Sequence, residues 1–122
     1  MEPNREPTIV GAAFLAAQAG QPEDAASYWR RAIAKSPYRS DYHAELAALC
    51  FQTRDWRAAS DACRAALRLN PTDVGTRMLL VRTYLRLKNP QAARDEFETL
   101  LGFDLPDRDD LLRRFAALAP HR

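Results

Sequence analysis

The sequence has little of the material from which several classes of functional site are built. Its 122 residues include four glycines, two cysteines, two histidines and two lysines. The glycines are dispersed, so none forms the glycine-rich loop that cradles a phosphate. No apolar run reaches the roughly 18 residues that a membrane-spanning helix needs. The first residues, MEPNREPTIVG, lack the basic start and apolar core of a secretory signal, which favours a cytoplasmic protein or a piece of a longer one.

An excess of one charge is also missing. Eighteen basic residues stand against 16 acidic ones and the two kinds are interspersed, so no field is evident that would attract nucleic acid or a membrane. Sixteen of the bases are arginine, which a coding bias explains as well as a binding role does. The abundant residues are alanine, leucine and arginine, and this mixture favours helices over strands. The length suits a single domain with its own core.

A repeat of 34 residues runs through the chain, since Pro37 and Pro71 are separated by that offset. The same offset aligns residues of matching size in six more columns: Ala25, Ala59 and Ala93; Trp29, Cys63 and Phe97; Ala32, Ala66 and Leu100; Ala12, Leu46 and Leu80; Ala13, Ala47 and Val81; Ala16, Cys50 and Tyr84. Each period contains two helical patterns. The patterns predict helices near 8–19, 22–35, 40–53, 55–69, 73–87 and 90–101, and a seventh over 107–118.

The residues at the predicted helix ends agree with these boundaries. Gly20 can close the first helix in a left-handed conformation. Prolines suit first turns and short polar side chains suit N-caps; the residues concerned are Pro22, Pro90, Asp55, Asn89 and Asp107.

The faces of the predicted helices are complementary in size. Ala59, Cys63 and Ala66 are spaced i, i+4 and i+7 on one face, so two small residues flank a larger one. A neighbouring antiparallel helix can therefore approach closely, and we expect Ala59 to be buried where the two helices touch.

On these residues the chain resembles the tetratricopeptide repeat family. The 34-residue period, the repeated alanines and prolines, the aromatic Trp29 and Phe97, and Trp56 at the start of a second helix match the family's pattern. The resemblance covers 6–106 as three repeats, 6–39, 40–73 and 74–106, with a capping helix at 107–119 and tails at 1–5 and 120–122. It implies an all-α, right-handed α-solenoid of three helix-turn-helix repeats plus that C-terminal helix.

The third repeat departs from the family's pattern. Val81 and Leu100 replace small residues, and the closing proline comes one position late, at Pro106. These departures fit a last repeat that packs against a different helix, to which Leu111, Leu112, Phe115 and Leu118 would belong.

Few residues suggest chemistry. His43 lies seven residues before Cys50, and with Cys63 these residues could be written as a nucleophile and base or as a partial metal site. All three fall in columns assigned to helix packing, where cysteine is a small apolar filler, so we assign no catalytic residue, no metal and no cofactor. Whether the two cysteines form a disulfide stays open. The basic pair Arg113 and Arg114 is weak support for a nucleic-acid site.

The remaining candidate is the groove that the resemblance implies along the first helices. Four columns spaced by 34 residues lie outside the packing positions and are mostly apolar. The candidate peptide-binding residues are Val10, Phe14, Ala44, Ala48, Phe51, Gln52, Met78, Arg82, Leu85 and Arg86. Some family members hold a C-terminal carboxylate with a lysine, asparagine and arginine set, and the corresponding places here hold Val10, Phe14, Glu45, Gly75 and Leu79, so that clamp is not expected.

These residues predict a non-enzymatic module that binds a protein or peptide in this groove. We expect it to bind neither nucleic acid nor a membrane. The two arginines predict acidic residues beside apolar anchors in the ligand, and Phe51 is expected to be exposed. The alternative is a structural segment of a larger protein or a weak homo-oligomer, with the groove covered by its own chain. The residues before Thr8 are the candidates for an intramolecular cover.

Overall fold

The computed structural model describes residues 4–103 and 107–118, which form seven α-helices and no strand. The helices are α1 (Glu6–Gln18), α2 (Pro22–Lys35), α3 (Ser40–Gln52), α4 (Trp56–Leu69), α5 (Val74–Arg86), α6 (Pro90–Leu101) and α7 (Arg108–Leu118). The all-α prediction is confirmed, and each boundary lies within two residues of its predicted place. The predictions for residues 1–3, 104–106 and 119–122 lie outside the described residues. None of the described helices is long and apolar enough to cross a bilayer.

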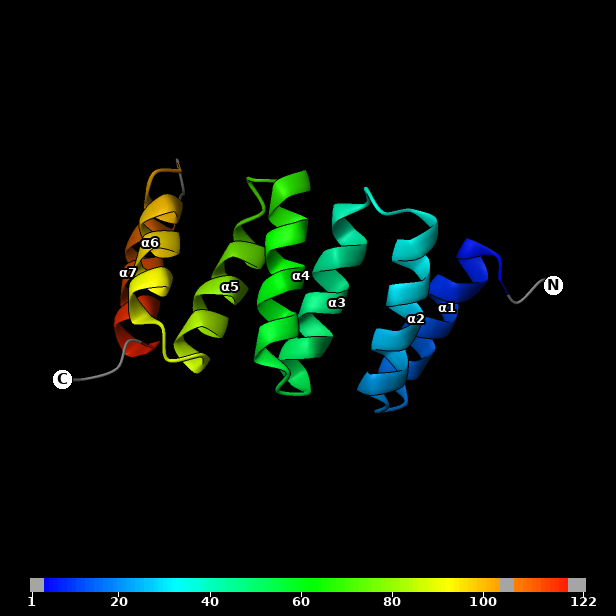
Figure 1. The fold of residues 1–122 in the computed structure, drawn as a ribbon. Helices are drawn as coiled ribbons and strands as arrows, with labels where there is room; N and C mark the ends of the chain where they lie inside the picture. The colour runs from blue at the N-terminus through cyan, green and yellow to red at the C-terminus, as the bar shows by residue number, and fades with distance from the viewer. Residues whose placement is uncertain (1–3, 104–106, 119–122) are drawn as a thin grey trace.

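The helices stack as hairpins in chain order. α1 packs on α2, α3 on α4 and α5 on α6, and the hairpins join where α2 meets α3 and α4 meets α5. Figure 1 shows this row running from α1 at one end to α6 and α7 at the other, with α2 and α4 in front of α1 and α3. α3 also contacts α5 directly. We call the side of the stack formed by α1, α3 and α5 the groove face.

Alanine allows the helices of each hairpin to approach closely. Ala13 and Ala25 in the first hairpin and Ala47 and Ala59 in the second are fully buried. The expectation for Ala59 is therefore confirmed. Most larger members of the packing columns, among them Trp29, are also buried, whereas Leu46 and Tyr84 are half-buried. Small residues beside large ones are what dense packing requires.

The three first helices end in the same backbone conformation. Gly20, Arg54 and Lys88 are 34 residues apart and have φ angles of 75°, 65° and 62°. Each donates its N–H to the carbonyl three residues before it, and the next residue donates to the carbonyl five residues before itself, at 3.1 and 2.9 Å in all three places. These bonds close the last helical turn. The prediction for Gly20 is confirmed, and the same conformation recurs where the residue is not glycine.

The helix starts follow the predicted capping. The side chains of Asp55 and Asn89 accept hydrogen bonds from the N–H groups of residues 58 and 92 at 3.3 and 3.2 Å. Asp73, which the sequence pattern did not single out, caps α5 in the same way at 3.2 Å. α1 begins at Glu6, two residues earlier than predicted, because Pro7 is well tolerated in a first turn, where its missing N–H is not needed.

α7 closes the stack. Leu111 is buried, and the ring of Phe115 stacks on that of Phe97 with centroids 4.2 Å apart. Leu112 points to solvent with 40% of its surface exposed, so it does not share in this packing. The side chain of Leu118 lies outside the described residues.

Candidate functional site

Six of the ten predicted groove residues line three hollows, and one of the six, Arg82, lines two of them. Val10 and Phe14 line one between α1 and α3, and Met78 lines another between α5 and α7, with Arg82, Arg114 and Ala117. The third lies where the end of the α3–α4 hairpin faces the end of α5, and it takes in Arg82, Leu85 and Arg86. On α3, Ala44 is half-buried, whereas Ala48 and Gln52 are exposed.

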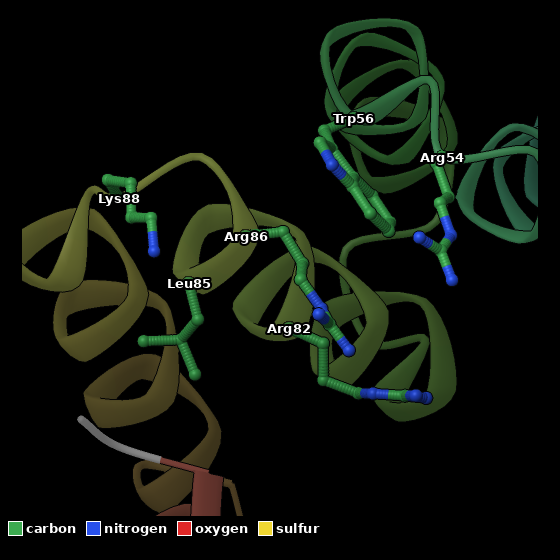
Figure 2. Close-up of a pocket in the computed structure, with 6 residues that line it drawn as sticks. All are labelled: Arg54, Trp56, Arg82, Leu85, Arg86 and Lys88. Carbon is green, nitrogen blue, oxygen red and sulfur yellow. The ribbon is translucent and has the colours of Figure 1, made fainter.

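The hollow between the α3–α4 hairpin and α5 is rich in positive charge, and we call it the basic hollow. It has a volume of about 460 Å³ and is lined by Arg54, Trp56, Arg82, Leu85, Arg86 and Lys88. Figure 2 shows the guanidinium groups of Arg82 and Arg86 reaching from α5 towards the side that carries Trp56 and Arg54. Lys88 stands apart from them, on the side of Leu85.

Aromatic rings hold two of these arginines in place. The Arg82 guanidinium carbon lies 4.7 Å from the centre of the Phe51 ring, and that of Arg86 lies 5.4 Å from the Trp56 ring. Phe51 and Trp56 contact each other edge to face at 4.9 Å. Stacking occupies the flat face of a guanidinium and leaves its in-plane N–H groups free to donate. The two arginines are thus preorganised as hydrogen-bond donors.

The cations of the basic hollow differ from the arginines that form salt bridges elsewhere in the stack. Within the described part of the chain, no carboxylate forms a salt bridge with Arg54, Arg82, Arg86 or Lys88. Five arginines elsewhere do have such partners, as in the pair between Arg77 and Glu96 at 2.6 Å, while exposed ones such as Arg57, Arg68 and Arg94 have none within the described residues. Like charges spaced i and i+4 on one helix repel each other, and Arg82 and Arg86 have that spacing. The basic hollow is therefore an uncompensated positive site.

Two residues that line the basic hollow also have a left-handed backbone conformation. Among residues 4–103 and 107–118, Arg54 and Lys88 are the ones with positive φ that are not glycine. Left-handed backbone costs a residue with a side chain about 1 kcal/mol, whereas glycine adopts it freely. Two of the four cations of the basic hollow therefore occupy positions where glycine would be the less strained residue, as Gly20 is in the first repeat.

The hollow between α1 and α3 has the opposite character, and we call it the acidic hollow. It has a volume of about 420 Å³, and its lining includes Glu6, Asp41 and Glu45 with one cation, Arg39. Arg39 and Asp41 form a two-point ion pair at 3.0 and 2.6 Å. This pair lowers the pKa of Asp41. Desolvation, with a smaller effect from Asp41, raises the pKa of Glu45.

Glu6, at the edge of the acidic hollow, is hydrogen-bonded to residues that follow α2 and begin α3. Ser36 donates a hydrogen bond to one of its carboxylate oxygens, and the Tyr42 hydroxyl donates to the other at 2.7 Å. These two bonds, that from Ser36 first, lower the pKa of Glu6. Asn4 accepts a hydrogen bond from Arg31 of α2 at 3.0 Å. Asn4 and Glu6 are thus bonded to the α2–α3 side of the stack. Glu6 and Pro7 also line the acidic hollow together with Val10 and Phe14, so a cover formed by the residues before Thr8 stays a prediction.

Exposure of the predicted apolar anchors differs from expectation. Phe14 is 49% exposed, but Phe51, Met78 and Leu85 are half-buried. Phe51 is covered by Trp56 and Arg82, while Met78 and Leu85 pack against the buried cluster of α5, α6 and α7. The expectation that Phe51 is exposed was wrong because the aromatic residue that opens α4 covers it.

Residues that line the basic hollow but were not predicted are Arg54, Trp56 and Lys88. The signal for two of them was present, because the 34-residue offset that aligns the repeats carries Gly20 onto Arg54 and then onto Lys88. A change from glycine to a cation in one column distinguishes the repeats from each other.

The cysteines and histidine do not form a reactive centre. Cys50 and Cys63 are buried free thiols, and burial raises the pKa of Cys50 and raises that of Cys63 to about 12. His43 Nε2 contacts the carbonyl oxygen of Pro37 at 2.9 Å. The described residues contain no group of three or more histidine, cysteine, aspartate or glutamate side chains arranged to hold a metal ion. The thiols are too weakly acidic for nucleophilic work at neutral pH.

Comparison with known proteins agrees with this architecture. A search of the curated proteins finds no match. Two crystal structures of MamA have a similar fold, each at 18% sequence identity. The first has a TM-score of 0.80 and the match covers 96% of this chain and 78% of the MamA chain. The second has a TM-score of 0.79 and the match covers 95% of this chain and 72% of the MamA chain. At this identity they show the fold alone, a helical-repeat solenoid as predicted. Two family models for the tetratricopeptide repeat match residues 11–74 and 52–113, each more than half of the sequence. The chain therefore belongs to the tetratricopeptide repeat family.

Proposed function

We propose that this chain is a non-enzymatic interaction module that binds an acidic, partly apolar polypeptide segment of a partner protein on its groove face. Tetratricopeptide repeats are in general protein-interaction modules. The acidic character of the ligand is inferred from the basic hollow, in which four cations lie beside the half-buried Trp56 and form no salt bridge with any described carboxylate. Uncompensated charge of this kind favours a ligand of opposite sign.

The geometry of the hollow supports a polypeptide as the ligand. Trp56 and Leu85 are half-buried, so each offers an apolar surface to a side chain of the ligand. The stacked arginines lose little further freedom when they donate to a carboxylate, which lowers the entropic cost of binding. A flexible segment that becomes ordered on such a surface binds with a free energy of about −8 kcal/mol, which is a Kd near micromolar.

The test uses fluorescently labelled peptides of equal length. One combines glutamate with leucine and the other combines lysine with leucine, and fluorescence polarisation measures their affinities. We expect the glutamate peptide to bind and the lysine peptide not to bind. Arg82→Glu removes one attraction and adds a repulsion, so it should weaken binding by at least about tenfold.

The matched control is Arg94→Glu, which makes the same change in net charge at an exposed position of α6. It should leave the affinity unchanged. An equal loss in both variants would mean that only net charge matters, and equal binding of the two peptides would contradict the proposal.

The alternative function, a structural segment whose groove is covered by another copy of the chain, makes a different prediction. Under it, the protein elutes as a dimer in size-exclusion chromatography at high concentration, and Arg82→Glu dissociates the dimer. Under the proposal above, the wild type and the variant elute alike.

A further inference from the structure

Arg54 and Lys88 occupy positions that the fold does not reserve for a cation. The backbone at these residues repeats that of Gly20, down to the hydrogen bonds that close the helix. A side chain placed at Gly20 would meet nothing within 4 Å, so crowding does not force glycine there. The fold needs a left-handed residue at the end of each first helix, and glycine meets that need with the least strain.

The electric field of the helix explains the two cations only in part. A positive charge after the last turn interacts favourably with the carbonyl groups at the helix end. α1, however, ends without any basic residue in its last turn, while α5 already has Arg86 there. Helix ends in this protein are thus stable without a cation, and Lys88 adds a further charge where one is already present.

Both strained cations line the same hollow. Arg54 follows α3 and Lys88 follows α5, and both contribute to the wall of the basic hollow. Figure 2 shows Arg54 on the side of Trp56 and Lys88 on the far side of the last turn of α5, near Leu85. Strained residues are retained where function requires them, and here the strain supplies charge at both sides of one binding surface.

We propose that Arg54 and Lys88 are specificity-determining residues that, with Arg82 and Arg86, bind acidic side chains placed on both sides of an apolar residue of the ligand. This inference rests on the proposed function and specifies its ligand. Because the cations are divided between the two sides of Leu85, a single carboxylate cannot neutralise them. The ligand is therefore a segment in which several glutamate or aspartate residues flank an apolar side chain that packs on Leu85.

The experiment compares two labelled peptides by fluorescence polarisation, one containing Glu-Glu-Leu-Glu-Glu and one containing Gln-Gln-Leu-Gln-Gln. We expect the wild type to prefer the glutamate peptide about 30-fold, since each exposed ion pair is worth up to about fivefold. In the double variant Arg54→Gly/Lys88→Gly the preference should fall to about threefold. Affinity for the glutamine peptide should not change.

Melting temperature provides a readout that separates binding from folding. Glycine relieves the strained backbone, so the double variant should melt no lower than the wild type. The exchange Arg54→Lys/Lys88→Arg keeps both charges and should keep the preference. Gly20→Arg introduces the strain in the first repeat; it should lower the melting temperature and leave the preference unchanged.

Three outcomes would overturn the inference. The double variant could keep the full preference, or it could melt well below the wild type, which would mean that the cations serve the fold. In either case the wild-type preference for the glutamate peptide and its loss in Arg82→Glu would keep the proposed function, and this inference alone would fail. If the wild type binds neither peptide, both fail together.

Discussion

The acidic and basic hollows lie on either side of α3 and have similar volumes, yet their charges are used differently. In the acidic hollow Arg39 is paired with Asp41, and Glu6 accepts hydrogen bonds from two residues of the same domain. In the basic hollow the guanidinium groups contact aromatic faces and no described carboxylate. Arg39, Asp41 and Glu6 thus have their partners within the domain, whereas the two stacked arginines of the basic hollow keep N–H groups for a ligand.

The aromatic residues of the two hollows are alike, so they do not account for this difference. Phe14 contacts Trp29 at 5.1 Å in the acidic hollow, and Phe51 contacts Trp56 at 4.9 Å in the basic one. The two pairs occupy different columns of the 34-residue repeat, since that offset carries Phe14 onto Ala48 and Trp29 onto Cys63. A phenylalanine–tryptophan contact is nevertheless present beside each hollow, so selectivity on the groove face should follow the charged positions more than the aromatic ones.

The largest loss of stability is expected from Ala59→Leu, which tests the helix packing that supports both hollows. Ala59 is fully buried between α3 and α4, and three more carbon atoms there should cost about 2–3 kcal/mol. Chemical denaturation measures the loss. Because each hairpin packs only on its neighbours, the damage should reach Trp56 in the second hairpin before Trp29 in the first. An unchanged denaturation midpoint would contradict the stacking described above.

Variants with a single tryptophan allow the unfolding of the first and second hairpins to be followed separately by fluorescence. Trp29→Phe leaves Trp56 as the reporter of the basic hollow, and Trp56→Phe leaves Trp29 as the reporter of the acidic one. In the Ala59→Leu background we expect the Trp56 signal to change at a lower denaturant concentration than the Trp29 signal. Coincident transitions would mean that the three repeats unfold as one unit.

A smaller effect is expected from removing Phe14, which lines the acidic hollow, or Phe51, which contacts Trp56 and Arg82 of the basic hollow. Phe51→Ala loses the contacts with Trp56 and Arg82 and should cost about 2 kcal/mol, whereas Phe14→Ala, at 49% exposure, should cost about 1 kcal/mol. Only Phe51→Ala should weaken binding of the glutamate peptide, because it releases Arg82. If Phe14→Ala weakens binding equally, the ligand site extends over both hollows and the contrast between them does not hold.

The fold could be predicted from the sequence because its signal is repeated. Alanine columns at a constant 34-residue offset identify the hairpins, and caps such as Asp55 identify their ends. Local chemistry decides each of these features, so they can be recognised without the structure. The helix predicted near 8–19 begins two residues earlier, at Glu6, since Pro7 suits a first helical turn.

The site was predicted only in part because it depends on contacts between repeats. Arg82, Leu85 and Arg86 share one face of α5 and could be found from spacing alone. Phe51 was expected to be exposed, since no local pattern shows that Trp56, the first residue of the next helix, folds over it. Likewise, the acidic hollow depends on Glu6 reaching a tyrosine 36 residues away in the sequence.

The smallest expected effect concerns the pH dependence of the acidic hollow. The pKa of Glu6 lies below its ordinary value of 4.5 because Ser36 and Tyr42 donate hydrogen bonds to the ionised carboxylate. A carboxyl group with a lowered pKa in the folded state stabilises the protein at pH values above 4.5, and this contribution is lost as the pH falls through the lowered pKa. Stability from this group is therefore present at neutral pH and disappears in acid.

Glu6→Gln and Tyr42→Phe each remove part of this arrangement and should lower the denaturation midpoint slightly at pH 7. The difference between wild type and Glu6→Gln should shrink as the pH is lowered below the ordinary carboxyl range, because the wild-type carboxylate then becomes protonated. Urea denaturation from neutral to acidic pH measures it. Affinity for the glutamate peptide at pH 7 should stay at the wild-type value in both variants, since Glu6 and Tyr42 line only the acidic hollow. A constant difference at all pH values would show that the charge on Glu6 is not what stabilises this end of the stack, and a change in peptide affinity would show that the two hollows are coupled through α3.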